Sequence, residues 1–191
     1  MSRAAFLDRD GVINRKPPEG DYVTRWEEFQ FLPGVVEAIV LLNQADFRVI
    51  VVTNQRSVAK GLMTASDLDS IHQQMCDTLA MNGATIDSVF YCPHELQPPC
   101  NCRKPRPGML LSAAAAHGID LAASWMIGDS DIDVEAGRNA GCKTARVLIN
   151  DEVLGSNADV IAPSLVDAVR KILGRDKSHS DPPPWELPGV Q

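Results

Sequence analysis

The sequence has few aromatic residues, no long apolar run and no excess of positive charge. Aromatic residues make up 5% of the 191 residues, and the formal net charge is −7. This acidic balance argues against a surface for non-specific binding to nucleic acid or to an anionic membrane. Without an apolar stretch of about twenty residues, a membrane-spanning helix is not expected either. We therefore expect a protein without nucleic-acid or membrane partners, in which a local basic cluster serves a specific site.

The first residues do not have the pattern of a secretory leader, because charged side chains occur within a few positions of the start. We expect a cytoplasmic protein that acts as a monomer. A length of 191 residues suits one α/β domain with a sizeable core better than two domains. Residues 175–191 are polar and rich in proline, which predicts an extended or disordered tail after a domain at 1–174.

Short apolar runs alternate with amphipathic stretches along the chain. The apolar runs predict strands at 4–7, 47–53, 85–92, 125–128 and 144–149. The amphipathic stretches predict helices at 34–45, 64–81, 107–117 and 131–140. This alternation indicates an α/β fold with a doubly wound, Rossmann-like parallel sheet and helices on both faces. No large insertion is visible, so we expect an open site without a cap domain.

Polar side chains lie where three predicted strands end. Asp8 and Asp10 follow the first strand, Thr53 and Asn54 lie at the end of the second, and Asp129 follows the fourth. Ligands of such sheets bind beyond the carboxyl ends of the strands, so these residues are candidates for an active site. One aspartate of the Asp8 and Asp10 pair can attack phosphorus as a nucleophile. The other can protonate the leaving oxygen and later activate water.

Other polar residues suit the same chemistry. Thr53 and Asn54 can hold phosphoryl oxygens by hydrogen bonds, and Lys104 can neutralise charge on a phosphoryl group. Asp129 is the candidate Mg²⁺ ligand, because this ion takes one or two protein carboxylates and keeps several waters. Asp131 is interpreted as a charge that favours a helix N-terminus. Taken singly, the aspartate pair and the Thr53–Asn54 pair are equally typical of turns, and a lone lysine is more typical of solvated surface.

Four soft or borderline metal ligands lie within eleven residues: Cys92, His94, Cys100 and Cys102. Four such ligands predict a closed tetrahedral site for structural Zn²⁺. A disulfide between Cys100 and Cys102 would be strained at that spacing. The zinc would staple loop 92–102, which has no core of its own, and would position Lys104 directly after it.

In order, the segments DRDGVIN, VTNQ, RKP and GDSDID resemble the four motifs of the haloacid dehalogenase (HAD) superfamily of phosphatases. The resemblance covers residues 3–150. It implies that Asp8 is the nucleophile and Asp10 the general acid and base, with Thr53 and Lys104 stabilising the phosphoryl group. It also implies that Mg²⁺ binds to Asp8, Asp129 and the backbone carbonyl of Asp10.

The cysteine pattern is similar to the branch that contains the D-glycero-D-manno-heptose 1,7-bisphosphate 7-phosphatases and the histidinol-phosphate phosphatases. The segments DYVTRWEEFQFLPGV and KGLMTASDLDSIHQQM resemble the heptose enzymes. In contrast, the five residues between His94 and Cys100 are more like the histidinol branch. The inserted residues RKPPEGD before Tyr22 and the presence of Ser57 also depart from the heptose pattern.

Basic residues near the motifs bear on the substrate: Arg56, Lys60, Arg103 and Arg106. Guanidinium groups suit a second phosphate, whereas they would repel the amine of histidinol phosphate. These charges favour a small phosphorylated sugar, namely the heptose bisphosphate, with histidinol phosphate as the alternative. The candidate substrate-binding residues are Asn54, Gln55, Arg56 and Arg103.

Two other classes of protein share parts of this pattern. A signalling receiver is also phosphorylated on aspartate, but its acceptor and its acidic pair occupy different strands, whereas Asp10 here stands beside Asp8. A zinc-knuckle module for nucleic acid is disfavoured by a pI of about 5.0 and by the lack of aromatic residues beside the cysteines. The expected function is therefore turnover of a phosphate ester.

Overall fold

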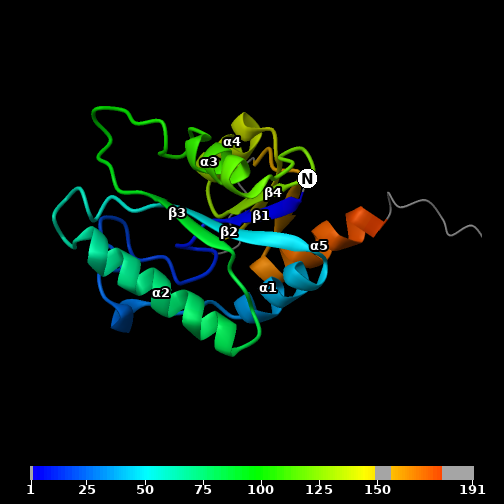
Figure 1. The fold of residues 1–191 in the computed structure, drawn as a ribbon, viewed down its shortest axis with the longest axis horizontal. Coiled ribbons are helices and arrows are strands. Elements are labelled where there is room, and N and C mark those ends of the chain that lie inside the picture. Colours follow the sequence, from blue (N-terminus) through cyan, green and yellow to red (C-terminus); the bar gives the residue numbers. More distant parts are fainter. Residues whose placement is uncertain (1, 149–155, 178–191) are drawn as a thin grey trace, which may run out of the picture.

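A parallel sheet forms the centre of the computed structural model, which describes residues 2–148 and 156–177. Within that part of the chain the sheet has six strands in the order β3-β2-β1-β4-β5-β6 (Figure 1). They are β1 (Arg3–Leu7), β2 (Phe47–Asn54), β3 (Ser88–Cys92), β4 (Trp125–Gly128), β5 (Lys143–Val147) and β6 (Val160–Ala162). Every neighbouring pair is parallel. The doubly wound α/β fold is thus confirmed.

Helices cover both faces of the sheet, as Figure 1 shows. On one face lie α1 (Val35–Gln44), α2 (Ala65–Met81) and α5 (Leu165–Lys177). On the other lie α3 (Gly108–His117) and α4 (Asp131–Ala140). A short 3-10 helix, η1 (Trp26–Glu28), lies in the long connection between β1 and α1. None of the helices in the described ranges is both long and apolar enough to cross a membrane.

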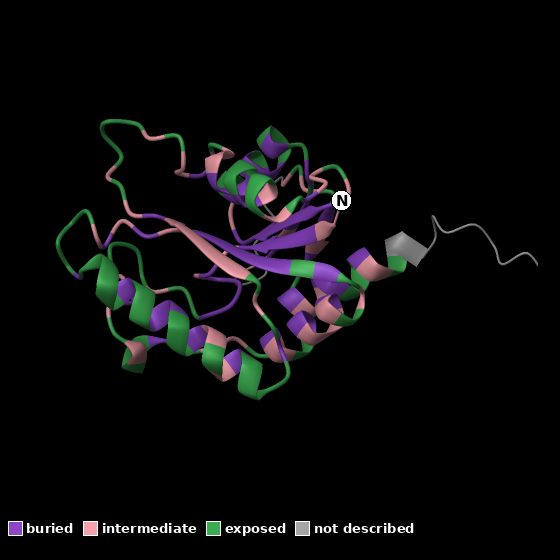
Figure 2. Ribbon diagram, in the orientation of Figure 1, coloured by how far each residue is buried: buried purple, intermediate pink, exposed green. Residues whose placement is uncertain are grey.

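The two faces are separated by the alternation of side chains along the strands. On β1, Ala5 and Leu7 belong to the core shared with α1, α2 and α5, while Ala4 and Phe6 pack with α3 and α4. Successive residues of a strand point to opposite faces, so a strand covered on both sides is apolar throughout. Helix α2 buries the side that faces the sheet and exposes the other (Figure 2).

The boundaries of several elements match the sequence analysis. Helix α4 and strand β4 have the predicted ends, and α2 begins after Thr64, whose side chain forms a capping box with Asp67. Strand β3 begins at Ser88 rather than at 85. The backbone N–H of the preceding Asp87 donates to the carbonyl of Val49, and its carboxylate accepts from the N–H of Val49. A side-chain hydrogen bond thus stands where the backbone ladder of the strand would otherwise continue.

The C-terminal part of the fold differs most from the prediction. Strand β6 and helix α5 were not predicted, and α5 continues to Lys177, so the chain is still helical at the start of the predicted tail. The remainder of that tail, 178–191, lies outside the described residues. So does position 149, the end of the strand predicted at 144–149, whereas β5 itself ends at Val147.

The order of the strands creates one switch point, between β1 and β4. From β1 the chain builds outward through β2 to β3, then returns to place β4 on the other side of β1. Connections diverge to opposite faces there, which opens a crevice at the carboxyl ends of the two strands. Asp8 directly follows β1 and Asp129 directly follows β4, so the fold brings both residues to this crevice.

Candidate active site

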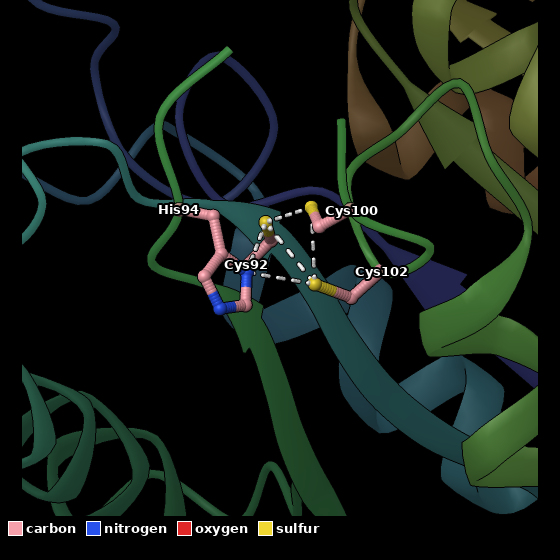
Figure 3. A group of neighbouring side chains, drawn as sticks. All are labelled: Cys92, His94, Cys100 and Cys102. Carbon is pink, nitrogen blue, oxygen red and sulfur yellow. Dashed lines mark hydrogen bonds between the residues drawn. The ribbon is translucent and has the colours of Figure 1, made fainter. Parts of the chain in front are cut away.

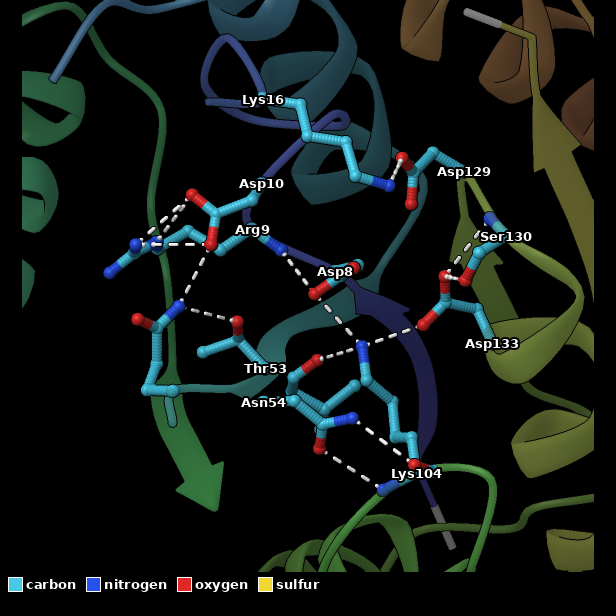
Figure 4. A network of polar contacts seen from close by, with 12 residues as sticks. Asp8, Arg9, Asp10, Lys16, Thr53, Asn54, Lys104, Asp129, Ser130 and Asp133 are labelled. Atoms are coloured by element: carbon cyan, nitrogen blue, oxygen red, sulfur yellow. Dashed lines mark hydrogen bonds and ion pairs between the residues drawn. The ribbon is translucent and has the colours of Figure 1, made fainter. Parts of the chain in front are cut away.

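Three carboxylates converge at the switch point around one lysine (Figure 4). Oxygen atoms of Asp8, Asp129 and Asp133 all lie within 4.8 Å of one another. The Nζ of Lys104 is 2.8 Å from Oδ1 of Asp8 and 2.7 Å from Oδ1 of Asp133. It also donates to the carbonyl of Val52 at 2.8 Å, so three acceptors fix the position of this buried ammonium group.

The charges in this cluster shift one another's pKa values. Burial raises the pKa of Asp8 to about 7, with Lys104 opposing the rise and the charges of Asp133 and Asp129 adding to it. Burial lowers the pKa of Lys104, but the charges of Asp133 and Asp8 outweigh this and raise the pKa above its ordinary value. Lys104 is therefore a permanent cation among carboxylates that still carry excess negative charge.

The donor atoms of this cluster suit Mg²⁺. The oxygens of Asp133 are already engaged: Oδ1 by Lys104, and Oδ2 by the backbone N–H and the hydroxyl of Ser130, at 3.1 and 2.6 Å. Asp8 and Asp129 therefore offer the oxygens for a metal, since this hard ion uses one or two protein carboxylates. Asp129 is paired with Lys16, whose Nζ lies 2.5 Å from Oδ2.

Asp10 is held by a separate set of donors, on the side away from Asp129 (Figure 4). Its carboxylate accepts hydrogen bonds from Arg9, from Asn14 at 2.9 Å and from Gln55 at 2.9 Å. Burial raises its pKa, but the charge of Arg9 and these hydrogen bonds prevail and lower the pKa below the ordinary value. Gln55 also donates to the hydroxyl of Thr53 at 2.9 Å, so it orients both residues.

One cavity of about 300 Å³ is lined by most of the predicted site residues. They are Asp8, Asp10, Thr53, Asn54, Gln55, Arg103, Lys104 and Asp129. Asn54 has an evident structural task, because its side-chain amide bonds to both the N–H and the carbonyl of Lys104, each at 3.1 Å. Its predicted contact with substrate stays a prediction, as does that of Gln55.

The predicted basic group is dispersed. Arg103 lines the cavity, and its Nη1 is buried without a hydrogen-bond partner in the described part of the chain. Arg56 instead pairs with Glu95 of the cysteine loop at 2.6 Å. Lys60 lies over the ring of Tyr22, and Arg106 donates to the carbonyl of Cys100. Of the four, Arg103 is placed best to meet a ligand.

The residues of the site that the sequence analysis missed include Arg9, Lys16 and Asp133. A signal for Asp133 was present, since Ser130 and Asp133 have the spacing of a capping box, which they form. No feature of the sequence indicated a role for Arg9. Burial of an arginine follows from tertiary contacts, here with Asp10 and with His72, whose Nε2 is 3.2 Å from Nη1.

The cysteine loop forms a second group of metal ligands. Figure 3 shows the three sulfur atoms and a ring nitrogen of His94 turned toward one another. The contacts among Cys92, His94, Cys100 and Cys102 measure 3.2–3.6 Å. Ligand bonds of about 2.0–2.3 Å in a tetrahedral zinc site would separate the ligand atoms by about 3.5 Å. The residues present therefore fit the predicted ion.

Comparisons with known proteins identify the relatives of this chain. Residues 101–168 match the HAD-hydrolase-like family model. The D-glycero-beta-D-manno-heptose-1,7-bisphosphate 7-phosphatase of Rhodopseudomonas palustris is 43% identical over 145 residues, covering 72% of this chain and 79% of the relative. The D-glycero-alpha-D-manno-heptose-1,7-bisphosphate 7-phosphatase of Mycobacterium tuberculosis is 38% identical over 165 residues, covering 86% of each.

A solved structure resembles the whole fold. The D,D-heptose 1,7-bisphosphate phosphatase of B. bronchiseptica, in complex with magnesium and phosphate, gives a TM-score of 0.81 at 34% identity. The match covers 91% of this chain and 99% of that one. The corresponding phosphatase of Burkholderia thailandensis gives a TM-score of 0.65 at 29% identity, covering 90% and 98%.

Proposed function

The chain belongs to the HAD-like family of D-glycero-D-manno-heptose-1,7-bisphosphate 7-phosphatases, and on this premise we propose that it removes the 7-phosphate of that sugar in nucleotide-activated heptose biosynthesis. It is thus a magnesium-dependent phosphoric monoester hydrolase. The observation that carries the proposal is the position of Asp8, which faces a 300 Å³ cavity between Lys104 and Asp129.

In the first half of the reaction, a carboxylate oxygen of Asp8 attacks the phosphorus of the 7-phosphate. The bond between phosphorus and the sugar oxygen breaks, and Asp10 donates a proton to that oxygen. Lys104 and Thr53 stabilise the charge on the phosphoryl oxygens in the transition state. The products are the heptose 1-phosphate and an aspartyl-phosphate on Asp8.

In the second half, water attacks the phosphorus of the aspartyl-phosphate while Asp10 accepts its proton. The bond to Asp8 breaks, which releases inorganic phosphate and restores the carboxylate. Arg9, Asn14 and Gln55 already hold Asp10 as an anion, the form that this step requires. Mg²⁺ held by Asp8, Asp129 and the backbone carbonyl of Asp10 would supply positive charge beside the transferring group.

We assign the Cys92, His94, Cys100 and Cys102 group to a structural Zn²⁺, as their contacts of 3.2–3.6 Å support. The ion would hold loop 92–102 and so the backbone that leads to Lys104. We further propose a cytoplasmic monomer that binds neither nucleic acid nor membrane. Its catalytic domain, expected at 1–174, extends to the end of α5 at Lys177.

The test is phosphate release from both anomers of the heptose 1,7-bisphosphate, with histidinol phosphate as the competing substrate. We expect kcat/KM for the bisphosphate to exceed that for histidinol phosphate by orders of magnitude, and Asp8→Asn to abolish turnover. A preference for histidinol phosphate would refute the assigned substrate. Activity of Asp8→Asn within tenfold of the wild type would refute the mechanism.

A further inference from the structure

Lys16 occupies an unexpected position at the edge of the carboxylate cluster. Its ammonium group lies 2.5 Å from Oδ2 of Asp129, a residue that fits a magnesium ligand. The two partners differ in freedom, because the side chain of Lys16 is 49% exposed and that of Asp129 only 2%. The side chain of Lys16 can therefore move away from Asp129, whereas the buried carboxylate of Asp129 is held in place by its surroundings. Figure 4 shows Lys16 reaching Asp129 from the side opposite to Lys104.

The charge of the cluster indicates a role for the contact between Lys16 and Asp129. When ionised, Asp8, Asp129 and Asp133 carry three negative charges, against one positive charge on Lys104 and one on Lys16. Replacing the ammonium of Lys16 at Asp129 with a divalent cation would bring the cluster to neutrality. A metal ion and the ammonium group of Lys16 repel each other when both lie at the carboxylate of Asp129, so each weakens the binding of the other there.

The segment around Lys16 can release the side chain without moving the backbone. Its predecessor Arg15 is held by a backbone hydrogen bond to Gln30 at 2.8 Å, and the next two residues are Pro17 and Pro18, which restrict the chain. Lys16 also lines the 300 Å³ cavity of Asp8 and Lys104, beside two neighbouring cavities of about 880 and 410 Å³. A displaced ammonium group therefore has room on the substrate side of the site.

We propose that Lys16 is a tethered counter-ion, which neutralises Asp129 in the metal-free enzyme and moves to the uncleaved phosphate of the substrate when Mg²⁺ binds. The second part rests on the proposed bisphosphate substrate. Competition by Lys16 weakens Mg²⁺ binding to the free enzyme, and a substrate that holds the lysine away removes this competition. Metal and substrate binding are then positively coupled through one side chain, by thermodynamic linkage.

The first experiment measures Mg²⁺ binding by calorimetry, without substrate, to protein that was purified in the absence of added Mg²⁺. The variants are Lys16→Met and Lys16→Gln. The control is Lys143→Met, which removes the same charge at the amino end of β5, where the ammonium lies over the ring of Trp125. A half-exposed ion pair supports an expected gain in affinity of about 3- to 10-fold for both Lys16 variants.

The control should bind Mg²⁺ within about twofold of the wild type, which separates the local contact from a general change in protein charge. Unchanged or weaker binding in both Lys16 variants would overturn the proposal, as would an equal gain in Lys143→Met. This first experiment uses no sugar substrate. It decides the counter-ion role even if the enzyme proves inactive on the heptose bisphosphate, so the two proposals fail separately.

The second experiment compares KM at saturating Mg²⁺ for the 1,7-bisphosphate and for the heptose 7-phosphate. If Lys16 holds the uncleaved phosphate, Lys16→Met raises KM for the bisphosphate by about 5- to 10-fold more than it raises KM for the monophosphate. An equal rise for both substrates would overturn the transfer to that phosphate.

Discussion

The guanidinium group of Arg9 lies against the carboxylate of Asp10, with Nη2 3.0 Å from Oδ1 and 3.1 Å from Oδ2. Arg9 is fully buried, and its Nη1 donates to Nε2 of His72 at 3.2 Å. The proposed general acid and base is thus ionised in the resting enzyme. A phosphate that enters beside Asp10 would raise its pKa by charge repulsion, which favours uptake of the proton needed by the leaving group.

Replacement of Arg9 with methionine should therefore change the pH dependence of the second half-reaction. Without the positive charge the pKa of Asp10 rises, so a higher pH is needed to ionise the base that activates water. We expect the acid limb of the dephosphorylation rate to move to higher pH. Rapid-quench measurement of phosphoenzyme decay between pH 4 and 8 tests this, with exposed Arg25→Met as the control. An unmoved acid limb would assign the titration to another group.

His72 should make the fold sensitive to acid. Burial and, to a smaller extent, the charge of Arg9 lower its pKa to about 3, partly opposed by the charge of Asp10. The unfolded chain then binds a proton below pH 6.5 that the folded chain does not, so stability is lost as pH falls from 6.5. The loss is about 1.4 kcal/mol per pH unit, or up to about 3 kcal/mol at pH 4.5.

The variant His72→Gln keeps an acceptor for Arg9 but cannot take up that proton. Urea unfolding at pH 7.5 and 4.5 should therefore show a smaller loss of stability for the variant than for the wild type. Equal losses would show that other groups govern the response to acid.

The positions of the proposed catalytic residues could be predicted because they follow from the ends of strands. In a parallel sheet, Asp8 and Asp129 meet when β1 and β4 are neighbours, as they are here. The partners of individual side chains could not be predicted. Asn54 bonds to the backbone of Lys104, and Arg56 pairs with Glu95. These pairings depend on the paths of the loops, which the hydrophobic periodicity of the sequence does not reveal.

The C-terminal elements were missed for two different reasons. Strand β6 has three residues, which is too short for a periodic signal. Helix α5 had a readable one: its buried residues Leu165, Ala168, Val169 and Ile172 recur at the spacing of a helical face. Helix α5 could therefore have been predicted from the sequence.

Removal of one cysteine should test the structural zinc. Purified protein is expected to hold about one Zn²⁺ per chain, and Cys100→Ser should lose most of it and lower kcat without altering a catalytic atom. Cys76→Ser, in helix α2 and outside the ligand group, is the matched control. Metal analysis by mass spectrometry gives the stoichiometry. Protein that was never exposed to chelator and still contains no zinc would contradict the assignment.

Asp133 is expected to position Lys104 rather than to bind magnesium, because Lys104 and Ser130 engage its oxygens. Asp133→Asn should lower kcat by about 10-fold or more, since the lysine loses one of its two charged partners, yet keep Mg²⁺ affinity within about threefold. Asp129→Asn should instead lose Mg²⁺ binding. Calorimetry beside steady-state kinetics separates these outcomes. An equal loss of Mg²⁺ affinity in both variants would make Asp133 a metal ligand.

Arg103 is expected to hold the phosphate that is not cleaved. Its Nη1 is buried without a hydrogen-bond partner among the described residues, and the side chain lines the cavity of Asp8 and Lys104. Because an unpaired buried donor favours an anionic ligand, Arg103→Ala should lose about 1.5–3 kcal/mol, or roughly 10- to 100-fold in kcat/KM for the bisphosphate. The heptose 7-phosphate should lose much less, and the control Arg48→Ala, an exposed arginine paired with Asp87, should change neither value. Equal losses on both substrates would mean that Arg103 serves the cleaved phosphate.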